Sequence, residues 1–305
     1  MDFGAYLPFL LPLPAVPLVL LAARRLHPAA ASWLTAASSA VLTIGAAVSL
    51  GLFAVAGLAG LSIVADSGKP DITDVPIDAT AAALLLAGLI TGTVAATRRA
   101  QALRAARDLA DPSPLVIVPT DRPIAHALPG HPGSIVVSTG MLAGLTPAER
   151  RALLAHEQAH LSRAHHRFVA VVDVLAAANP LLRPLRKVVR YTTERWADEL
   201  AARAVGSRAI VARAVGKAAL ATKNHAITPD PVLLAAAAGE VPRRVAALLI
   251  APPARRLRLI LTSPTGMFAL VAIGLTVASA ACALEAAGDL HHVLTLAAGS
   301  PASTR

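Results

Sequence analysis

The sequence predicts an α-helical polytopic membrane protein, with about four spans and a small α+β domain inserted before the last span. Three observations support this fold class. The 305-residue chain is 55% hydrophobic, with a mean hydropathy of +0.62 and only 3% aromatic residues. Four long apolar stretches are free of charged side chains, and the basic residues gather between the third and the fourth. Such an excess of Ala, Leu and Val suits lipid-facing helices better than a soluble interior.

The apolar stretches cover about 5–22, 33–63, 79–97 and 264–284. Each is long enough for a hydrocarbon core of roughly 30 Å. The second exceeds one crossing, so we expect it to tilt, bend or extend past the headgroups. The first is the least certain helix because it contains several prolines. These are Pro8, Pro12, Pro14 and Pro17. A cleaved signal peptide is the alternative there, although the basic residues that should precede one are missing.

The distribution of charge predicts the orientation. Of the 28 Lys and Arg residues, 24 lie in residues 98–262, whereas the loop 64–78 has four aspartates against Lys69. The positive-inside rule therefore places 98–262 in the cytoplasm and both termini outside, in a bacterial-type cell membrane. The net charge of +10 therefore mostly reflects the orientation of the chain in the membrane. Direct nucleic-acid binding is the alternative use of these charges, but no recognised motif supports it.

Three regions follow from this pattern: a three-span membrane region at 1–97, a cytoplasmic domain at 98–262, and a last span with a short tail at 263–305. The lone cysteine, Cys282, lies in the last span. One cysteine excludes a disulfide within the chain and a cysteine-based metal site. This usage fits a domain in a reducing cytoplasm.

The cytoplasmic domain begins with a basic helix at 98–113, followed by short β-rich runs and then by helices. We expect strands at 115–119, 123–128 and 134–138, with Gly140 ending the last. A long helix should begin at Thr146, because Thr146 and Glu149 can form a capping box around Pro147. Further helices are expected at about 168–178, from Pro184 to Gly206, at 208–223 and at 230–250.

His156-Glu157-Gln158-Ala159-His160 lies in the middle of the capped helix. A spacing of four places both imidazoles on one face of a helix, where they can bind a single ion. Glu157 can reach a metal-bound water without being a ligand. Chance would give this pattern in roughly one such chain in a hundred. The motif therefore predicts a zinc site, with Glu157 as general base.

A second motif, Glu194-Arg195-Trp196-Ala197-Asp198, follows 34 residues after His160. Its two carboxylates share one helix face at positions i and i+4. We expect Glu194 to be the third zinc ligand and Asp198 to orient a ligand histidine. For Glu194 and for Glu199 the alternative is an ordinary solvated charge, and for Glu199 that alternative is preferred.

These residues resemble the membrane zinc peptidases of the BlaR/MecR antirepressor type, and more distantly the heat-shock and CAAX prenyl membrane proteases. The resemblance rests on the two motifs, on SIVVSTGMLAGLTPAE before them and on VPRRVAALL at 241–249, and it covers 115–262. It implies a zincin fold (HExxH…ExxxD) and cleavage of a cytoplasmic protein. About 20 residues follow the last span, so we expect no external penicillin-binding sensor domain.

Other polar residues carry weaker expectations. Arg203 is a tentative stabiliser of developing negative charge. His165 and His166 should lie on the same helix as the motif and be solvated, with oxyanion stabilisation as the alternative. His126 and His131 could line the cleft, although the odds are against it. Asp173 is expected to be a polar residue within a packed helix pair.

The sequence thus predicts a membrane-embedded zinc metalloendopeptidase with one Zn²⁺ per chain, held by His156, His160 and Glu194. Its partners would be the lipid bilayer and a cytoplasmic protein substrate. Regulated proteolysis of a winged-helix transcriptional repressor, a signal-transduction role, is the preferred function. Quality control of membrane proteins and a non-enzymatic signalling protein with a structural metal are the alternatives. The strand at 134–138 is expected to be an exposed edge that pairs with substrate. The oligomeric state stays open.

Overall fold

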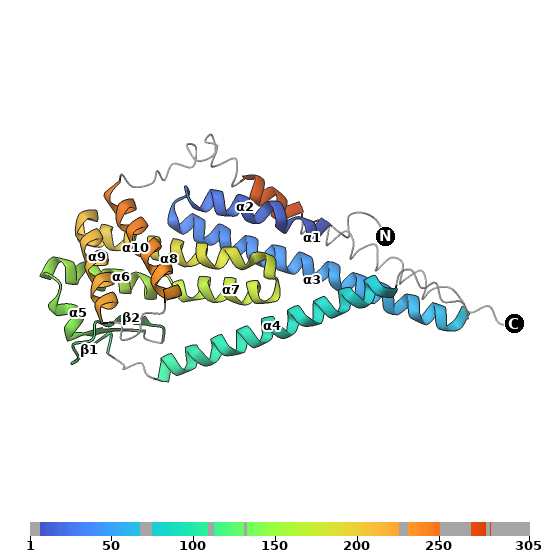
Figure 1. Ribbon diagram of the computed structural model, residues 1–305, viewed down its shortest axis with the longest axis horizontal. Coiled ribbons are helices and arrows are strands. Elements are labelled where there is room, and N and C mark those ends of the chain that lie inside the picture. The colour runs from blue at the N-terminus through green and yellow to red at the C-terminus, as the bar shows by residue number, and fades with distance from the viewer. Residues whose placement is uncertain are drawn as a thin grey trace.

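The computed structural model describes residues 7–67, 75–108, 113–130, 133–225, 231–250, 270–278 and 281. A helical bundle lies at one end, and a small sheet with helices along one side of it lies at the other (Figure 1). The elements are α1 (Leu7–Leu10), α2 (Pro12–Ala23), α3 (Pro28–Ser67), α4 (Val75–Asp108), β1 (Leu115–Val118), β2 (Ala125–Leu128), β3 (Ser134–Ser138), α5 (Thr139–Ala143), α6 (Pro147–Ser162), α7 (His165–Ala178), η2 (Pro180–Leu182), α8 (Arg183–Val205), α9 (Arg208–Asn224) and α10 (Pro231–Leu249).

Within the described residues, two helices are long and apolar enough to cross a membrane: Pro28–Val55 in α3 and Ala79–Asp108 in α4. They agree with the second and third predicted spans and hint at membrane association. The first predicted span forms α1 and α2, of which α2 has only 12 residues. The fourth lies mostly outside the described residues. Four spans are therefore not confirmed.

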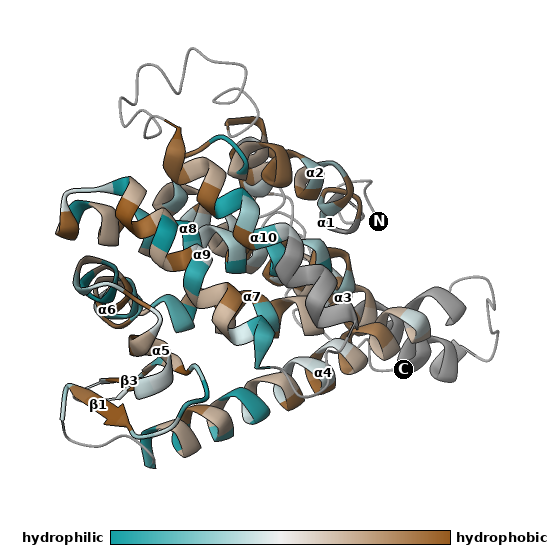
Figure 2. Cartoon of the chain, turned by 60° about the vertical axis from the view of Figure 1, so that its left-hand side comes forward, coloured by the Kyte–Doolittle hydropathy of each residue, from teal (hydrophilic) through white to brown (hydrophobic). Residues whose placement is uncertain are grey.

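Helix α4 exposes an unusually apolar surface. Only 6% of its most apolar window is buried, and Leu84, Leu86 and Leu89 are each more than half exposed. The hydrophobic half of α4 is continuous with the bundle, and its hydrophilic half approaches the sheet (Figure 2). Contiguous apolar surface of this kind is rare on soluble monomers and is favourable against lipid.

Helix α7 packs against α4 at a pair of small residues. Ala178 lies against Gly88 and Gly92, which are four residues apart on α4. The Thr91 hydroxyl donates to the Ala177 carbonyl at 2.9 Å, which provides a partner at the end of α7. Small residues at this spacing allow close approach of helix backbones. As a result α7 and the first half of α8 lie alongside the bundle.

The three strands form one mixed sheet in the order β1-β3-β2. Strand β3 pairs in parallel with β1 and antiparallel with β2, for example Val136 with Val116 and with His126. The prediction that residues 134–138 form an exposed edge is therefore wrong. The apolar run Ile-Val-Val marked a strand buried on both faces rather than an accessible one. The outer strands among the described residues are β1 and β2.

Gly140 fixes the approach from β3 into the helices. A Cβ on Gly140 would lie 2.0 Å from the carbonyl oxygen of Asp121, so only glycine permits this contact. Helix α6 then begins with the expected capping box, in which Thr146 accepts from the Glu149 N–H and Glu149 accepts from the Thr146 N–H. Loop and capped helix together set the position of the histidine motif.

Helix α6 ends earlier than expected. Ala164 adopts a left-handed conformation with φ of 48° and separates α6 from α7. His165 and His166 therefore begin α7, and the prediction that they share the motif helix is wrong. The turn redirects α7 toward the bundle and brings His165 back against the motif.

Glu199 is buried, so its interpretation as a solvated charge is also wrong. It accepts from Arg195 at 2.6 Å and pairs with Arg208 at the start of α9. Arg208 in turn donates to the carbonyls of Ala247 and Leu248 on α10, at 2.7 and 2.9 Å. This network joins α8, α9 and α10 beneath the functional site.

Candidate metal centre and active-site cleft

The side chains of His156, His160 and Glu194 converge from α6 and α8. The two Nε2 atoms are 3.2 Å apart, and each lies 3.4 Å from a carboxylate oxygen of Glu194. Ligands about 2.0–2.2 Å from a tetrahedral Zn²⁺ are separated by roughly 3.3–3.5 Å. The spacing of the three predicted ligands therefore fits one zinc-sized ion.

Each of the two candidate ligand histidines has an outer partner at its other ring nitrogen. Asp198 Oδ1 lies 3.1 Å from Nδ1 of His156. His165 Nδ1 lies 3.1 Å from Nδ1 of His160. Outer partners of this kind fix the tautomer and orientation of a ligand histidine. His165 is buried rather than solvated, which corrects the sequence-based expectation.

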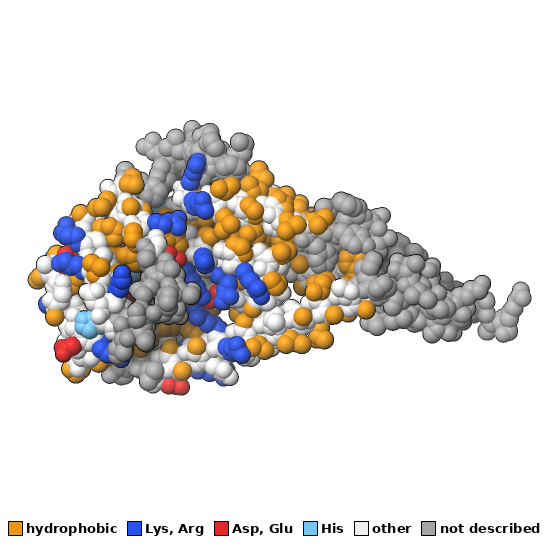
Figure 3. Space-filling model, viewed as in Figure 1, with side chains coloured by type: hydrophobic (Ala, Val, Ile, Leu, Met, Phe, Trp, Pro, Cys, Tyr) orange, Lys and Arg blue, Asp and Glu red, His pale blue; other side chains and the backbone are white. Residues whose placement is uncertain are grey.

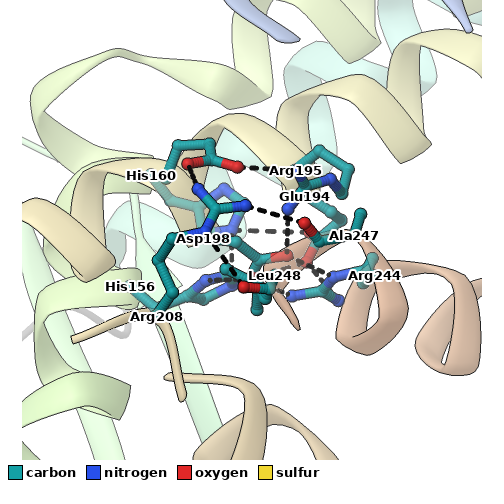
Figure 4. A network of polar contacts seen from close by, with 10 residues as sticks. His156, His160, Glu194, Arg195, Asp198, Arg208, Arg244, Ala247 and Leu248 are labelled. Carbon is teal, nitrogen blue, oxygen red and sulfur yellow. Dashed lines mark hydrogen bonds and ion pairs between the residues drawn. The ribbon is translucent and has the colours of Figure 1, made fainter. Parts of the chain in front are cut away.

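Arg244 of α10 holds both acidic residues of the second motif (Figure 4). Its Nε and Nη2 donate to the two oxygens of Asp198 at 2.9 and 2.7 Å, and its Nη1 lies 2.8 Å from Glu194 Oε2. Two hydrogen bonds from one guanidinium to a carboxylate restrict the orientation of that carboxylate more than a single ion pair does. Arg244 therefore positions Glu194, the third candidate ligand, together with Asp198, the partner of His156.

The charges favour a cation at the centre. Burial lowers the pKa of His156, but Asp198 and Glu194 outweigh burial and raise it to about 10. Burial would raise the pKa of Asp198, whereas Arg244 and His156 lower it to about 2. The pKa of Glu194 is also held well below its usual value against burial, by His156 and Arg244. Burial lowers the pKa of His160 to about 4, so this imidazole is neutral and ready to ligate.

Glu157 points into a cleft of about 380 Å³ beside the ligands. Burial raises the pKa of the Glu157 carboxyl, and the neighbouring backbone N–H of Ala127 on β2 opposes this shift. A carboxylate with a raised pKa exchanges a proton more readily near neutrality, as a general base requires. The cleft walls come from β2 and from the bundle. They include Ala127 and Pro129 on one side, and Arg99, His166 and Val169 on the other.

The structure separates the weaker candidates. His126 lines the cleft, contrary to the preferred expectation. Arg203 does not reach it; its exposed side chain lies 3.3 Å from His27 Nε2, so the geometry does not support a role in charge stabilisation. Asp173 pairs with Arg186 and Arg190 across α7 and α8, as expected for a packed helix pair. His131 lies outside the described residues.

Residues 91–178 match the family model of peptidase family M48. The matched segment begins in α4, contains the sheet and both motif histidines, and ends before Glu194. It spans less than a third of the chain. No curated protein and no solved structure matches the chain. The match supports a metallopeptidase of family M48, and it does not confirm the BlaR/MecR subfamily that the sequence resembles.

Proposed function

We propose that this chain is a membrane-embedded zinc metalloendopeptidase. The observation that carries the proposal is the convergence of His156, His160 and Glu194 next to Glu157 in a cleft: the two Nε2 atoms are 3.2 Å apart, and each lies 3.4 Å from one of the two Glu194 oxygens. The M48 match supports the same reaction class. A purely structural metal would need no open cleft and no buried carboxylate beside the ligands, so the non-enzymatic alternative is less well supported.

Bound zinc would polarise the scissile carbonyl and make a water molecule acidic enough to ionise near neutral pH. The proton transfers are made by a side chain of the protein. Glu157 accepts it from the attacking water and returns it to the leaving amine. Asp198 and His165 keep the two imidazoles oriented. Arg244 keeps Glu194 ionised and in place.

Strand β2, rather than β3, supplies the edge for an extended peptide. The carbonyl of Ile124 accepts from the Ser138 N–H, so every second residue from Ile124 onward directs its backbone groups toward β3. Ala125 and Ala127, which lie between those residues, direct their backbone groups away from β3. Both alanines line the cleft. Main-chain pairing at this edge would hold a peptide beside Glu157 with little dependence on its sequence.

We infer the predicted topology for this site, with 98–262 in the cytoplasm and both termini outside. The site-facing ends of the two spanning helices are Pro28 and Asp108, so α3 and α4 run antiparallel, and the end of α3 and the start of α4 lie away from the site (Figure 1). Arg24, Arg25, Arg98 and Arg99 lie near the site-facing end. External labelling of Thr120→Cys and Ser300→Cys, each in a Cys282→Ser background, tests this. Only position 300 should react in intact cells, and labelling of position 120 would overturn the inference.

Regulated cleavage of a cytoplasmic transcriptional repressor is the substrate proposal that follows from the BlaR/MecR resemblance. Quality control of membrane proteins is a second candidate, favoured by the position of Arg99 and Val169, which bring bundle helices into the cleft wall. Comparing the proteomes of wild-type and Glu157→Gln cells separates the two. A stabilised DNA-binding repressor supports regulation. Accumulation of misfolded membrane proteins alone supports quality control, and no change under any stress would contradict both.

A further inference from the structure

Two adjoining cavities, of about 210 and 200 Å³, lie where α2, α8 and α10 meet. They share Ala23, Arg24, Tyr191 and Thr192 in their walls. The α8 residues in their walls lie on a different face of that helix from Glu194. They are Lys187, Val188, Tyr191, Thr192 and Arg195. These cavities are separate from the metal cleft, and the peptidase mechanism uses neither of them.

The walls of the two cavities are strongly cationic. Five basic side chains line them, against the single carboxylate of Glu240. They are Arg24, Arg25, Lys187, Arg195 and Arg243. Arg195 is only 6% exposed, and its Nη1 has no hydrogen-bond partner within the described chain; Asp198 Oδ2 is 3.9 Å away. The Nη2 of Arg195 donates to Glu199, and a buried donor such as Nη1 is costly to leave without an acceptor.

The site lies where the apolar helix α2 ends, which is where lipid headgroups would lie if the apolar helices cross a bilayer. The Ser32 hydroxyl of α3 donates to Thr192 in the wall at 2.9 Å. Trp33, the next residue, is 62% exposed, and tryptophan is enriched at the membrane interface. Apolar α2 ends at the cavities with Leu20 and Ala23. Lys and Arg side chains collect between the globular end and the apolar bundle (Figure 3).

We propose that these two cavities bind the phosphate-containing headgroup of an anionic phospholipid. Phosphate oxygens would accept hydrogen bonds from the guanidinium and ammonium groups, and Arg is well suited to this geometry. The acyl chains would stay against the apolar surface of α2. Charge complementarity selects anionic over zwitterionic lipid, and basic clusters at a membrane surface bind acidic lipids in this way.

The site is connected to the metal centre through neighbouring residues. Arg243, which stacks over the Tyr191 ring at 4.8 Å, precedes Arg244, which holds Glu194 and Asp198. Arg195 follows Glu194 directly. A headgroup between Arg243 and α8 therefore holds α10 in the position that orients the third ligand. Given the proposed peptidase function, anionic lipid raises the cleavage rate.

Binding is tested without relying on activity. Full-length protein carrying Glu157→Gln is stripped of lipid and titrated with short-chain phosphatidylglycerol, phosphatidylcholine or glycerol phosphate, with bound lipid counted by native mass spectrometry. We expect one phosphatidylglycerol per chain and no saturable phosphatidylcholine. The triple variant Arg24→Gln, Lys187→Gln, Arg243→Gln should bind on the order of a hundredfold more weakly. The control Arg98→Gln, Arg104→Gln, Arg107→Gln removes the same charge from exposed positions of α4 and should bind as before.

Equal weakening in both triple variants would show nonspecific surface attraction and overturn the site. Equal affinity for glycerol phosphate would show a soluble-anion site and overturn the lipid assignment. If the triple variant does not fold, the single variant Lys187→Glu, at an exposed position, serves in its place. In active protein, vesicles of phosphatidylcholine mixed with phosphatidylglycerol should speed cleavage over phosphatidylcholine alone, and should do so less in the cavity variant. If no vesicle supports cleavage, the proposed function fails while the binding result still decides the lipid site.

Discussion

Arg244 of α10 and Asp198 of α8 form a two-point ion pair, with donor–acceptor distances of 2.9 and 2.7 Å across 46 residues of sequence. Asp198 is fully buried and faces His156 on its other side. The pair therefore links the position of α10 to the orientation of His156, a candidate metal ligand. Without Arg244, Asp198 and Glu194 would both lose their strongest cationic neighbour.

Replacing Arg244 should weaken metal binding rather than abolish the fold. Arg244→Gln removes the charge that orients Glu194 and Asp198, and loss of such an outer contact lowers metal affinity about 10- to 100-fold. Competition with a chromogenic chelator measures the change. Arg203→Gln, on the same α8 helix as the motif but outside the cleft, is the control and should keep wild-type affinity. Unchanged zinc affinity in Arg244→Gln would show that the contacts of Arg244 with Glu194 and Asp198 are not needed for metal binding.

Substrate binding should depend on the free edge of β2. Ala125→Pro removes a backbone N–H that is turned away from β3, spares the Ala127 N–H beside Glu157 and leaves the β2–β3 hydrogen bonds intact. We expect KM for an extended peptide to rise about tenfold or more, with zinc content and unfolding temperature close to wild type. Wild-type KM in a folded, zinc-loaded Ala125→Pro protein would contradict the pairing of substrate with β2.

Gly140 should tolerate no side chain. Gly140→Ala places a Cβ 2.0 Å from the Asp121 carbonyl, which forces the loop and β3 apart. We expect destabilisation of about 1–3 kcal/mol or more, read from chemical unfolding in detergent. Gly144→Ala is the matched control, because no atom lies within 4 Å of its Cβ and its φ of −76° suits alanine. Equal stability of the two variants would contradict the close approach at Gly140.

The capping box of α6 predicts a dependence of stability on pH. The Lys217 hydrogen bond at 2.7 Å and the Thr146 N–H lower the pKa of Glu149 from 4.5 to about 2. Because the folded pKa is depressed, the stabilisation is full above about pH 4.5 and is lost as the pH falls toward 2. The stability difference between wild type and Glu149→Gln should therefore shrink between about pH 5 and pH 3. A difference that is constant over this range would contradict the assignment.

The convergence of the histidine motif with Glu194 and the helix starts could be predicted because short-range spacing and capping determine them. Thr146 with Glu149, and His156 with His160, are such local patterns. The expectation of an edge at 134–138 overlooked a signal that the sequence carries, because a continuous apolar run is typical of a central strand buried on both faces. His165 was placed incorrectly because the left-handed Ala164 has no sequence signature.

The contacts of Arg244 and Glu199 were also inaccessible from the sequence, because they join residues 46 and 9 positions apart on separate helices. The double arginine at 243–244 belongs to the segment that carries the family resemblance. That resemblance does not predict that Arg244 pairs with the motif on α8. The buried position of Glu199 depends on Arg208, which lies across the Gly206 turn. Ion pairs between separate helices thus determine the surroundings of Arg244 and Glu199, and short-range spacing does not predict such pairs.

The central claim is that Glu157 moves the proton in a zinc-dependent peptide hydrolysis. Glu157→Gln keeps the size of the side chain and removes the base, so the purified variant should hold one zinc while its kcat falls about 10²- to 10⁴-fold. Zinc content and peptide cleavage are measured on the same preparation, with wild type alongside. The account predicts full zinc and almost no cleavage. A zinc-loaded Glu157→Gln protein that cleaves peptide at the wild-type rate would contradict it.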